Sequence, residues 1–309
     1  MQPPAPVMNP ARSLLPGLQN ADGGWGVLPK GPSATEPTAL AAMALRDAED
    51  PQAARSGARG LDWLGERQRR DGSWPASDQV PMGSWMTSLA VLALADSQRG
   101  RSRAVKGARW LLGQEGRPVS LVTRLFFFVL PRYNVIDLDL ELKGWPWYKD
   151  TFGWVEPTAC ALIALKKLRG HLPEPSTGSR IEEGERLILD RVCEGGGWNY
   201  GNSRVYDEEL WPYPDTTALA LLALQDRPNL PEVRSSLDAL DRMVARNDSL
   251  LATSLALLCG RVYGRPAESL SRRIVEHLEA ASPWIDVRAL ALAALALRDG
   301  PVPLAFAHA

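Results

Sequence analysis

The sequence predicts an all-α fold in which helical hairpins close into an α/α toroid. Three observations predict it: a short phrase that recurs along the chain, a run rich in Ala and Leu behind each copy, and an amphipathic segment after most of them. Recurrence indicates that one supersecondary unit has been copied and that each copy buries its apolar face on its neighbours.

Each copy of the phrase predicts the start of an inner helix. The copies are Glu36-Pro37-Thr38-Ala39-Leu40, Trp85-Met86-Thr87-Ser88-Leu89, Glu156-Pro157-Thr158-Ala159-Cys160 and Asp215-Thr216-Thr217-Ala218-Leu219, with weaker ones at Leu251-Ala252-Thr253-Ser254-Leu255 and Asp286-Val287-Arg288-Ala289-Leu290. Thr, Ser or an acid near a helix start can satisfy or complement its free N–H groups. Because the runs that follow are apolar nearly all round, these helices should be buried on most faces.

Outer helices are predicted between the inner ones, at 51–68, 102–114, 180–193, 231–246 and 266–281, where charges fall on one side of each segment. The outer helix that pairs with the first inner one should be short or missing. An open solenoid usually carries polar terminal repeats. The last run here, Ala289 to Leu297, is as apolar as the others, which favours a closed ring.

We expect residues 1–309 to form one domain, with an aromatic-rich insertion at about 116–154. Phe126-Phe127-Phe128 in that insertion would cover the cavity, dip into a membrane surface or form a buried helix, and the sequence leaves these alternatives open. The oligomeric state is not predicted.

Bulk composition excludes several function classes. A formal net charge of −1 gives no reason to expect nucleic acid as a partner. Cys160, Cys193 and Cys259 fit neither a zinc spacing nor a disulfide framework, so no metal or other cofactor is expected. We find no signal peptide and no membrane-spanning run, and therefore expect a cytoplasmic protein with possible peripheral membrane contact.

When the copies of the phrase are aligned, one column varies in a way that suggests a catalytic or binding role. Two residues before the Thr or its equivalent stand Glu36, Trp85, Glu156, Asp215, Leu251 and Asp286. A closed ring would bring these residues to one level, near one mouth of a central cavity. Converging carboxylates repel each other, which raises pKa values and keeps an acid protonated near neutral pH. The alternative is that each acid only caps its own helix.

Aromatic residues precede two of these helices and predict a lined pocket. Those chosen as substrate-binding candidates, beside Glu36, Trp85 and Asp286, are Trp145, Trp147, Trp154, Trp198, Tyr200, Trp211 and Tyr213. Aromatic faces can stabilise a carbocation or stack on a sugar. Packing of turns is the alternative for any one of them.

A more specific pattern lies in the second repeat, where Arg59-Gly60-Leu61-Asp62-Trp63-Leu64 is followed by Gln68, Gly72 and Trp74. It resembles the QW motif of squalene–hopene cyclases and other triterpene cyclases. Partial copies include Gln19, Gly23 and Trp25. The resemblance extends to the prenyltransferase and squalene-oxidase repeat superfamily and covers nearly the whole chain. It implies an α/α toroid, with the motif serving the scaffold rather than catalysis.

The resemblance also implies a catalytic acid. Triterpene cyclases open an inner helix with Asp-x-Asp-Asp-Thr-Ala, whose middle Asp protonates an alkene or epoxide. Here the equivalent stretch reads Tyr213-Pro214-Asp215-Thr216, so the middle acid is kept and its two neighbouring acids are replaced. On this basis Asp215 is the predicted proton donor and Glu156 its partner acid.

The sequence therefore predicts a terpene-cyclase-like enzyme that isomerises or cyclises an isoprenoid or another apolar small molecule by acid initiation. Two alternatives stay open: a non-catalytic toroid that binds a lipid or protein partner, and a glycan-active (α/α)6 enzyme with paired acids.

Overall fold

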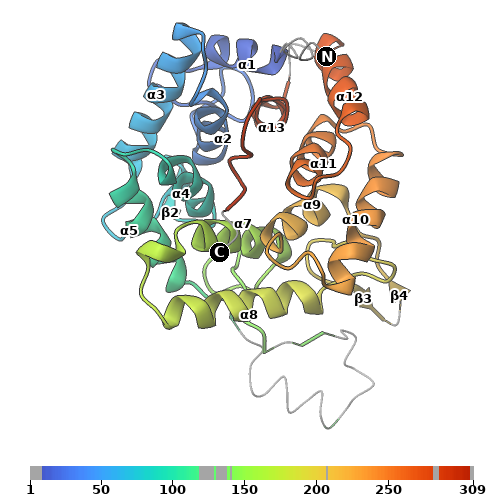
Figure 1. Ribbon diagram of the computed structural model, residues 1–309. Helices are drawn as coiled ribbons and strands as arrows, with labels where there is room; N and C mark the ends of the chain where they lie inside the picture. Colours follow the sequence, from blue (N-terminus) through green and yellow to red (C-terminus); the bar gives the residue numbers. More distant parts are fainter. Residues whose placement is uncertain are drawn as a thin grey trace.

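The computed structural model describes residues 9–117, 129, 138–139, 141–206, 208–280 and 285–306. Inner helices stand side by side around a central axis, and outer helices surround them (Figure 1). The ring closes because α13 packs against α2 as well as against α11. The chain thus forms the predicted α/α toroid rather than an open solenoid.

Within the described residues, six helices form the inner ring. They are α2 (Thr35–Leu45), α4 (Thr87–Ala95), α7 (Val155–Lys167), α9 (Pro214–Ala223), α11 (Leu250–Val262) and α13 (Val287–Ala296). Almost every residue of α2, α4 and α7 is buried. The Ala and Leu content explains this burial, since small and aliphatic side chains let neighbouring helices pack on all sides.

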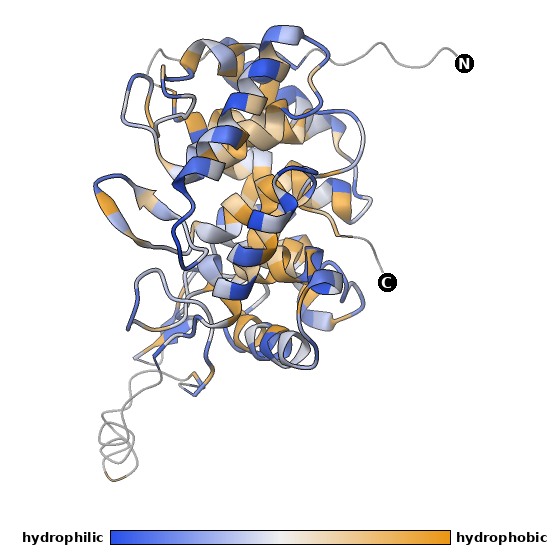
Figure 2. Ribbon diagram, turned by 90° about the vertical axis from the view of Figure 1, so that its left-hand side faces the viewer, coloured by the Kyte–Doolittle hydropathy of each residue, from blue (hydrophilic) through white to orange (hydrophobic). Residues whose placement is uncertain are grey.

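The outer helices agree with the predicted segments to within a few residues. They are α3 (Pro51–Arg67), α5 (Arg101–Leu112), α8 (Ser176–Asp190), α10 (Pro231–Val244) and α12 (Glu268–Glu279), with the short α1 (Pro10–Leu14) and the 3-10 turn η1 (Leu15–Leu18) before α2. Helix α8 begins four residues earlier than predicted. Figure 2 shows the expected polarity, with hydrophilic residues on the outer helices and hydrophobic ones inside.

Short strands occur only as hairpins in the described loops. They are β1 (Pro75–Ser77) with β2 (Val80–Gly83), and β3 (Arg204–Val205) with β4 (Glu208–Glu209), and a second 3-10 turn, η3, spans Arg169–His171. Both hairpins lie in loops that lead into inner helices, so they belong to the rim at the N-terminal ends of those helices. The described part of the 116–154 insertion supplies the loop before α7, and Phe126–Phe128 lie outside the described residues.

A repeated tryptophan holds the hairpins together. The backbone N–H groups of Trp25, Trp74, Trp145 and Trp198 each donate to a Thr Oγ1 of the next inner helix at 2.9 Å. Each indole N–H donates to a carbonyl of the preceding outer element, at 2.6–2.9 Å. All four rings are buried. The Thr of the phrase is therefore the acceptor that anchors a buried tryptophan.

The Gln of the same pattern bridges successive hairpins. Gln68 Nε2 donates to the carbonyls of Gly72 and Arg103, both at 2.9 Å, and Gln19 does the same one hairpin earlier, to Gly23 and Ser56. Gly72 has φ +100°, a left-handed conformation that favours glycine, and a Cβ there would lie 2.7 Å from the Lys106 carbonyl.

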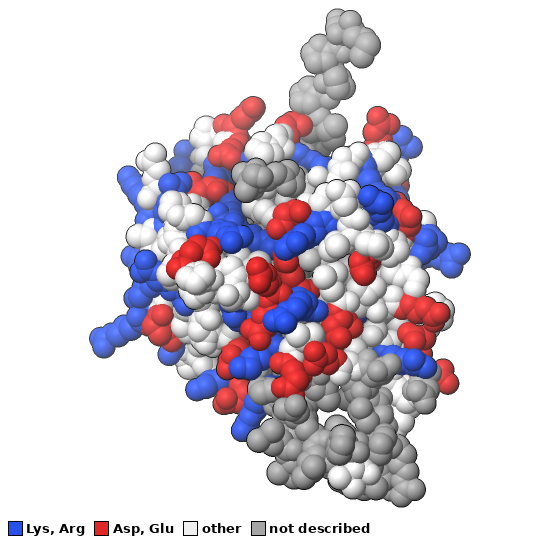
Figure 3. Space-filling view, turned by 60° about the horizontal axis from the view of Figure 1, so that its bottom comes forward, with Lys and Arg blue, Asp and Glu red and all other residues white. Residues whose placement is uncertain are grey.

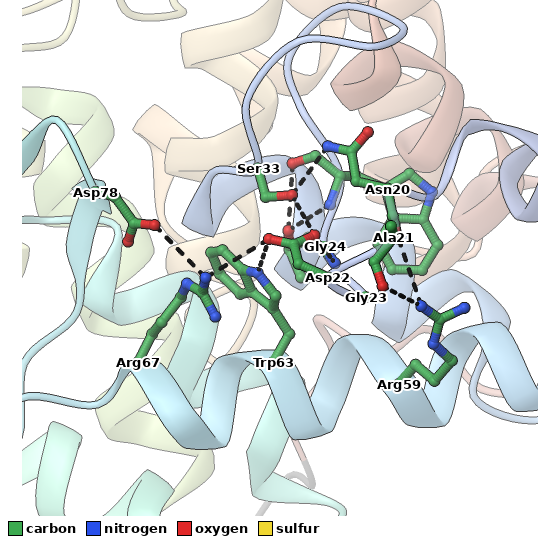
Figure 4. Close-up of polar contacts among 12 residues, drawn as sticks. Asn20, Ala21, Asp22, Gly23, Gly24, Ser33, Arg59, Trp63, Arg67 and Asp78 are labelled. Atoms are coloured by element: carbon green, nitrogen blue, oxygen red, sulfur yellow. Dashed lines mark hydrogen bonds and ion pairs between the residues drawn. The ribbon is translucent and has the colours of Figure 1, made fainter.

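An aspartate network joins the loop before α2 to helix α3 (Figure 4). Asp22 accepts hydrogen bonds from the Trp63 indole at 2.8 Å, the Ser33 hydroxyl at 2.8 Å and the Gly24 N–H at 3.0 Å. Arg67 lies 3.5 Å from the same carboxylate and covers the Trp63 ring. These contacts fix the loop that carries part of the rim.

The segment after α13 crosses the ring at the C-terminal ends of the inner helices (Figure 1). The Lys167 ammonium donates to the Pro303 carbonyl at 2.7 Å, and the Gln225 side chain bonds both the Leu304 carbonyl and the Phe306 N–H. Leu304 is buried. This segment therefore covers the far end of the toroid.

The charges of the surface are mixed. On the face drawn in Figure 3, acidic and basic side chains alternate rather than gather by sign. Among the residues that the structure describes, no helix combines the length and hydrophobicity needed to cross a membrane.

Candidate functional site

A cavity of about 280 Å³ lies inside the ring of inner helices. Its wall is built in layers that follow the helical repeat. The first layer, at the N-terminal ends of the inner helices, consists of Glu36, Trp85, Glu156, Asp215, Leu251 and Arg288. The cavity therefore has a polar mouth at the end where the rim loops lie.

Each residue of the mouth is followed four positions later by a residue of the second layer. That layer consists of Leu40, Leu89, Cys160, Leu219, Leu255 and Leu292. Residues four apart stack on one face of a helix, about 6 Å deeper along its axis. Leu92, Ile163 and Leu304 lie beyond them. Below its mouth the cavity is thus apolar and ends against the C-terminal segment.

Helix α13 corrects the alignment of the sixth repeat. Glu36, Glu156, Asp215 and Leu251 are each the second residue of their helix, and the second residue of α13 is Arg288. Asp286 stands outside the helix as its N-cap and accepts from the Arg288 N–H at 2.8 Å. The predicted alignment was therefore wrong by two residues, and Asp286 does not line the cavity but holds Arg288, which does.

Two carboxylic acids at the mouth have no partner within the part of the chain that the structure describes. Within the described residues, neither Glu156 nor Asp215 makes a side-chain hydrogen bond or an ion pair. Burial, followed by the nearby charges of Glu36 and Asp215, raises the pKa of Glu156 to about 7, although the charge of Arg288 opposes the shift. Glu156 is therefore a carboxyl group at the mouth that can hold a proton near neutral pH.

Glu36 differs from these two because it has a cationic neighbour. Arg288 Nη1 lies 3.5 Å from the Glu36 carboxylate, while Arg288 Nη2 lies 2.7 Å from Asp286. Burial raises the pKa of Glu36, and the charge of Arg288 opposes that shift. The guanidinium is thus already shared between two acids, which leaves the charges of Glu156 and Asp215 uncompensated.

Three aromatic residues form one wall of the cavity. Trp147 occupies the middle, with its ring centroid 6.5 Å from stacked Trp85 and 6.0 Å from Tyr200, which meets it edge-on. Trp154 supports Trp147 at 6.4 Å, and Tyr213 supports Tyr200 at 5.3 Å. Burial and the charges of Asp215 and Glu156 raise the pKa of the Tyr200 hydroxyl, so this wall adjoins the acids.

The remaining predicted aromatics lie elsewhere. Trp145 and Trp198 do not line the cavity, because their rings fill the junctions between hairpins described above. Trp211 is 84% exposed, and Trp154 and Tyr213 contact the wall only from behind. The pattern of aromatics before a helix marks both scaffold and pocket residues, and the sequence does not separate them.

The rim around the mouth exposes apolar side chains. Among the described residues, the exposed large hydrophobic side chains other than Leu14 and Val129 belong to the loops before α2, α4, α7 and α9. They are Val27, Leu28, Met82, Trp147, Tyr148, Phe152, Tyr200, Tyr206, Leu210, Trp211 and Tyr213. The entrance to the apolar cavity is therefore itself surrounded by an apolar rim.

Sequence reasoning missed Arg288 and the second layer. Arg288 was visible as the residue at the Thr position of the last phrase, where a basic side chain breaks the pattern. The second layer was visible as the residue that ends each five-residue phrase, except in the sixth. Cys160, a buried residue of α7, belongs to this wall.

No protein-family model matches the sequence, and no curated protein matches it. Solved structures match the fold at low identity. An α-amylase from Clostridium perfringens has a TM-score of 0.65 at 12% identity, covering 96% of this chain and 98% of its own. An α-1,6-mannanase of Salegentibacter has a TM-score of 0.59 at 10% identity, covering 93% and 96%.

Type II terpene cyclases match as well. MstE from Scytonema has a TM-score of 0.54 at 16% identity, covering 90% of this chain and 79% of its own. A variant of MstE has been solved with its substrate, geranylgeranyl dihydroxybenzoate. These neighbours are α/α toroid enzymes that act on glycans or isoprenoids, and at such identities they establish the fold that this chain shares with them.

Proposed function

We propose that this protein is an enzyme that isomerises or cyclises an isoprenoid or a similarly apolar molecule after protonating it. The proposal is carried by Glu156, which has no partner among the described residues and lies at the polar mouth of a leucine-lined cavity, where its pKa is raised to about 7. The cavity would take the hydrocarbon chain, and the acid would meet the double bond or epoxide at the entrance.

The roles of the two acids follow from their surroundings. Glu156 is the proton donor in this proposal, because its pKa is raised to about 7 and, unlike Glu36, it has no ion pair with Arg288. Asp215, the donor implied by sequence resemblance, becomes the neighbouring carboxylate. Once the proton leaves, a carbocation would face Glu156, Asp215 and the aromatic faces of Trp85 and Trp147. Groups that stabilise the charge more strongly than the neutral substrate accelerate the reaction.

Turnover in deuterated water tests the proposed chemistry. The enzyme is incubated with farnesol, geranylgeraniol or squalene in D₂O, and the products are examined by mass spectrometry. Because the carboxyl proton exchanges with solvent, an isomer or cycle formed by protonation should carry one deuterium. Products without deuterium, or no turnover of any isoprenoid in the panel, would contradict the proposal.

A glycan-active enzyme is the second candidate. It is favoured by the amylase and the mannanase, which match this chain over nearly their whole lengths, and by aromatic rings that could stack on sugars. The layer of Leu40, Leu89, Leu219, Leu255 and Leu292 weighs against it, since a sugar there would lose hydrogen bonds to water. Release of reducing ends from malto- or manno-oligosaccharides would favour it over the isoprenoid proposal.

The apolar rim supports a second part of the proposal, in which the protein contacts a lipid surface peripherally and takes up its substrate there. Replacing Trp211, the most exposed of its side chains, by Ala should weaken co-sedimentation with phosphatidylcholine vesicles about fiftyfold, because an immersed indole buries roughly 100 Å² of apolar area, worth about 2.5 kcal/mol. Leu14→Ala, at an exposed site outside the rim, is the matched control and should bind as the wild type does. Equal binding of both variants would remove the rim from the proposal.

A further inference from the structure

The mouth of the cavity combines two features that the proposed reaction does not by itself require. It holds two carboxylic acids, Glu156 and Asp215, and neither makes an ion pair or a side-chain hydrogen bond with the described residues, although Arg288 lines the same mouth. It also holds three aromatic rings, with that of Trp147 in contact with those of Trp85 and Tyr200. Carboxylates beside an aromatic wall are a general arrangement for binding an organic ammonium group.

From this we infer that the site binds apolar amines, with the ammonium group between the acids and the aromatic wall and the hydrocarbon chain in the leucine-lined floor. The inference rests on the same cavity as the proposed function and names the headgroup that this cavity selects. It does not require that the amine be turned over.

The charged groups at the mouth favour a cationic ligand over an anionic one. The cationic group that lines the cavity is Arg288, and its guanidinium is held by Asp286 at 2.7 Å and by Glu36 at 3.5 Å. Asp286 is itself directed to Arg288 through its N-cap contact. An arriving anion would therefore meet uncompensated carboxylates and a guanidinium already in use, whereas a cation would meet vacant acceptors.

The aromatic wall sets the kind of cation. Trp147 is 37% exposed and Tyr200 is 40% exposed, so both leave area open for a ligand. Ring faces attract alkylated ammonium groups, which shed water easily, and each desolvated face strengthens the contact. A hydrated divalent metal ion would gain little from rings and needs more oxygen ligands than this wall offers. The floor below adds the requirement for a long apolar chain.

Binding of three ligands with one chain and different headgroups tests the inference. The full-length protein is titrated at pH 7 with N,N-dimethylfarnesylamine, farnesol and farnesoic acid, below their aggregation concentrations, by calorimetry or tryptophan fluorescence. The amine should bind at least about tenfold more tightly than the alcohol, and the acid more weakly than the alcohol. An acid that binds as tightly as the amine, or an amine no tighter than the alcohol, would overturn it.

Variants assign the preference to the residues. In the double variant Glu156→Gln with Asp215→Asn, the ratio of amine to alcohol affinity should fall to about one while the alcohol still binds, which shows that the cavity is intact. Trp147→Leu should reduce the same ratio by several-fold. Asp78→Asn removes an exposed acid that does not line the cavity, and it should leave the ratio unchanged. A double variant that keeps the preference for the amine would place the selectivity elsewhere.

The outcomes separate this inference from the proposed function. Tight and selective amine binding without isoprenoid turnover would support the headgroup assignment and contradict the catalytic one. Turnover of isoprenoids without amine selectivity would do the reverse. If millimolar Mg²⁺ displaced the amine from the wild type, and less so from variants that lack Glu156 or Asp215, these carboxylates would form a metal site and the inference would be overturned.

Discussion

Replacing Glu156 by Gln should lower turnover of an isoprenoid by at least about a thousandfold, within the range found for general acids. Gln keeps the size and polarity of the side chain but cannot deliver a proton. Because Glu156 makes no hydrogen bond or ion pair with the described residues, the substitution leaves no protein group unpaired and removes a buried charge. We therefore expect thermal stability to be equal to that of the wild type or higher.

The pH profile of the wild type gives an independent measure of the same group. Since the active form is protonated, kcat should be constant at low pH and fall as pH rises through about 7, the value to which burial, Glu36 and Asp215 raise the pKa of Glu156. Replacing Arg288 by Met should move this fall to higher pH, because Arg288 is the neighbour that lowers this pKa.

Asp215→Asn provides the decisive comparison. With Glu156 as donor, the Asn variant should keep more activity than Glu156→Gln, and its profile should fall at lower pH because one repelling charge is gone. If Asp215→Asn is the inactive variant and Glu156→Gln stays active, the roles are those implied by sequence resemblance. That result would contradict the assignment made from the surroundings of the two acids.

Replacing Trp74 by Ala should lower the free energy of unfolding by about 3–5 kcal/mol, the usual cost of deleting a large buried aromatic side chain. Its ring is fully buried between hairpins, and its indole donates to the Leu64 carbonyl at 2.7 Å. The substitution leaves a cavity and also leaves that buried carbonyl without its donor. Against a typical domain stability of about 5–15 kcal/mol, such a loss is large.

Two further variants divide the effect of Trp74. Trp74→Phe keeps most of the ring and removes the hydrogen bond, so it should cost roughly 1–2 kcal/mol. Trp211→Ala removes the same side chain from a position that is 84% exposed and should cost less than about 0.5 kcal/mol. Urea denaturation of all three measures the differences. Equal losses for Trp74→Ala and Trp211→Ala would show that the buried tryptophan is not a structural anchor.

Most of the fold could be predicted because its signal is repeated. In the first four repeats the Thr of the phrase lies in the first turn of an inner helix and accepts the N–H of a buried Trp. Because the same contact is made several times, its residues recur, and the pattern can be recognised in a single sequence. Closure of the ring was also predictable, since the last inner helix is as apolar as the middle ones and packs on the first.

The site was less predictable because its residues are the exceptions to the repeat. Glu156 and Asp215 could be chosen from their column, but the pKa of Glu156 depends on Glu36 and Arg288, which reach the same mouth from helices far away in sequence. Helix α13 begins two residues later in its phrase than α2, α7, α9 and α11 do, and no local signal fixed that offset. Trp147 and Trp145 differ by two positions and have opposite roles, since one lines the cavity and the other is buried in the scaffold.

The segment that carries Leu304 makes the cavity blind at one end. If the cavity binds a hydrocarbon chain as proposed, the chain enters tail first and the product leaves through the same opening. The closed end would also set the distance between the tail of the chain and the carbon atoms that the acids at the mouth can protonate. Truncating the side chain that closes the cavity, as in Leu304→Ala, would then increase the chain length of the preferred substrate and leave the chemistry at the mouth unchanged.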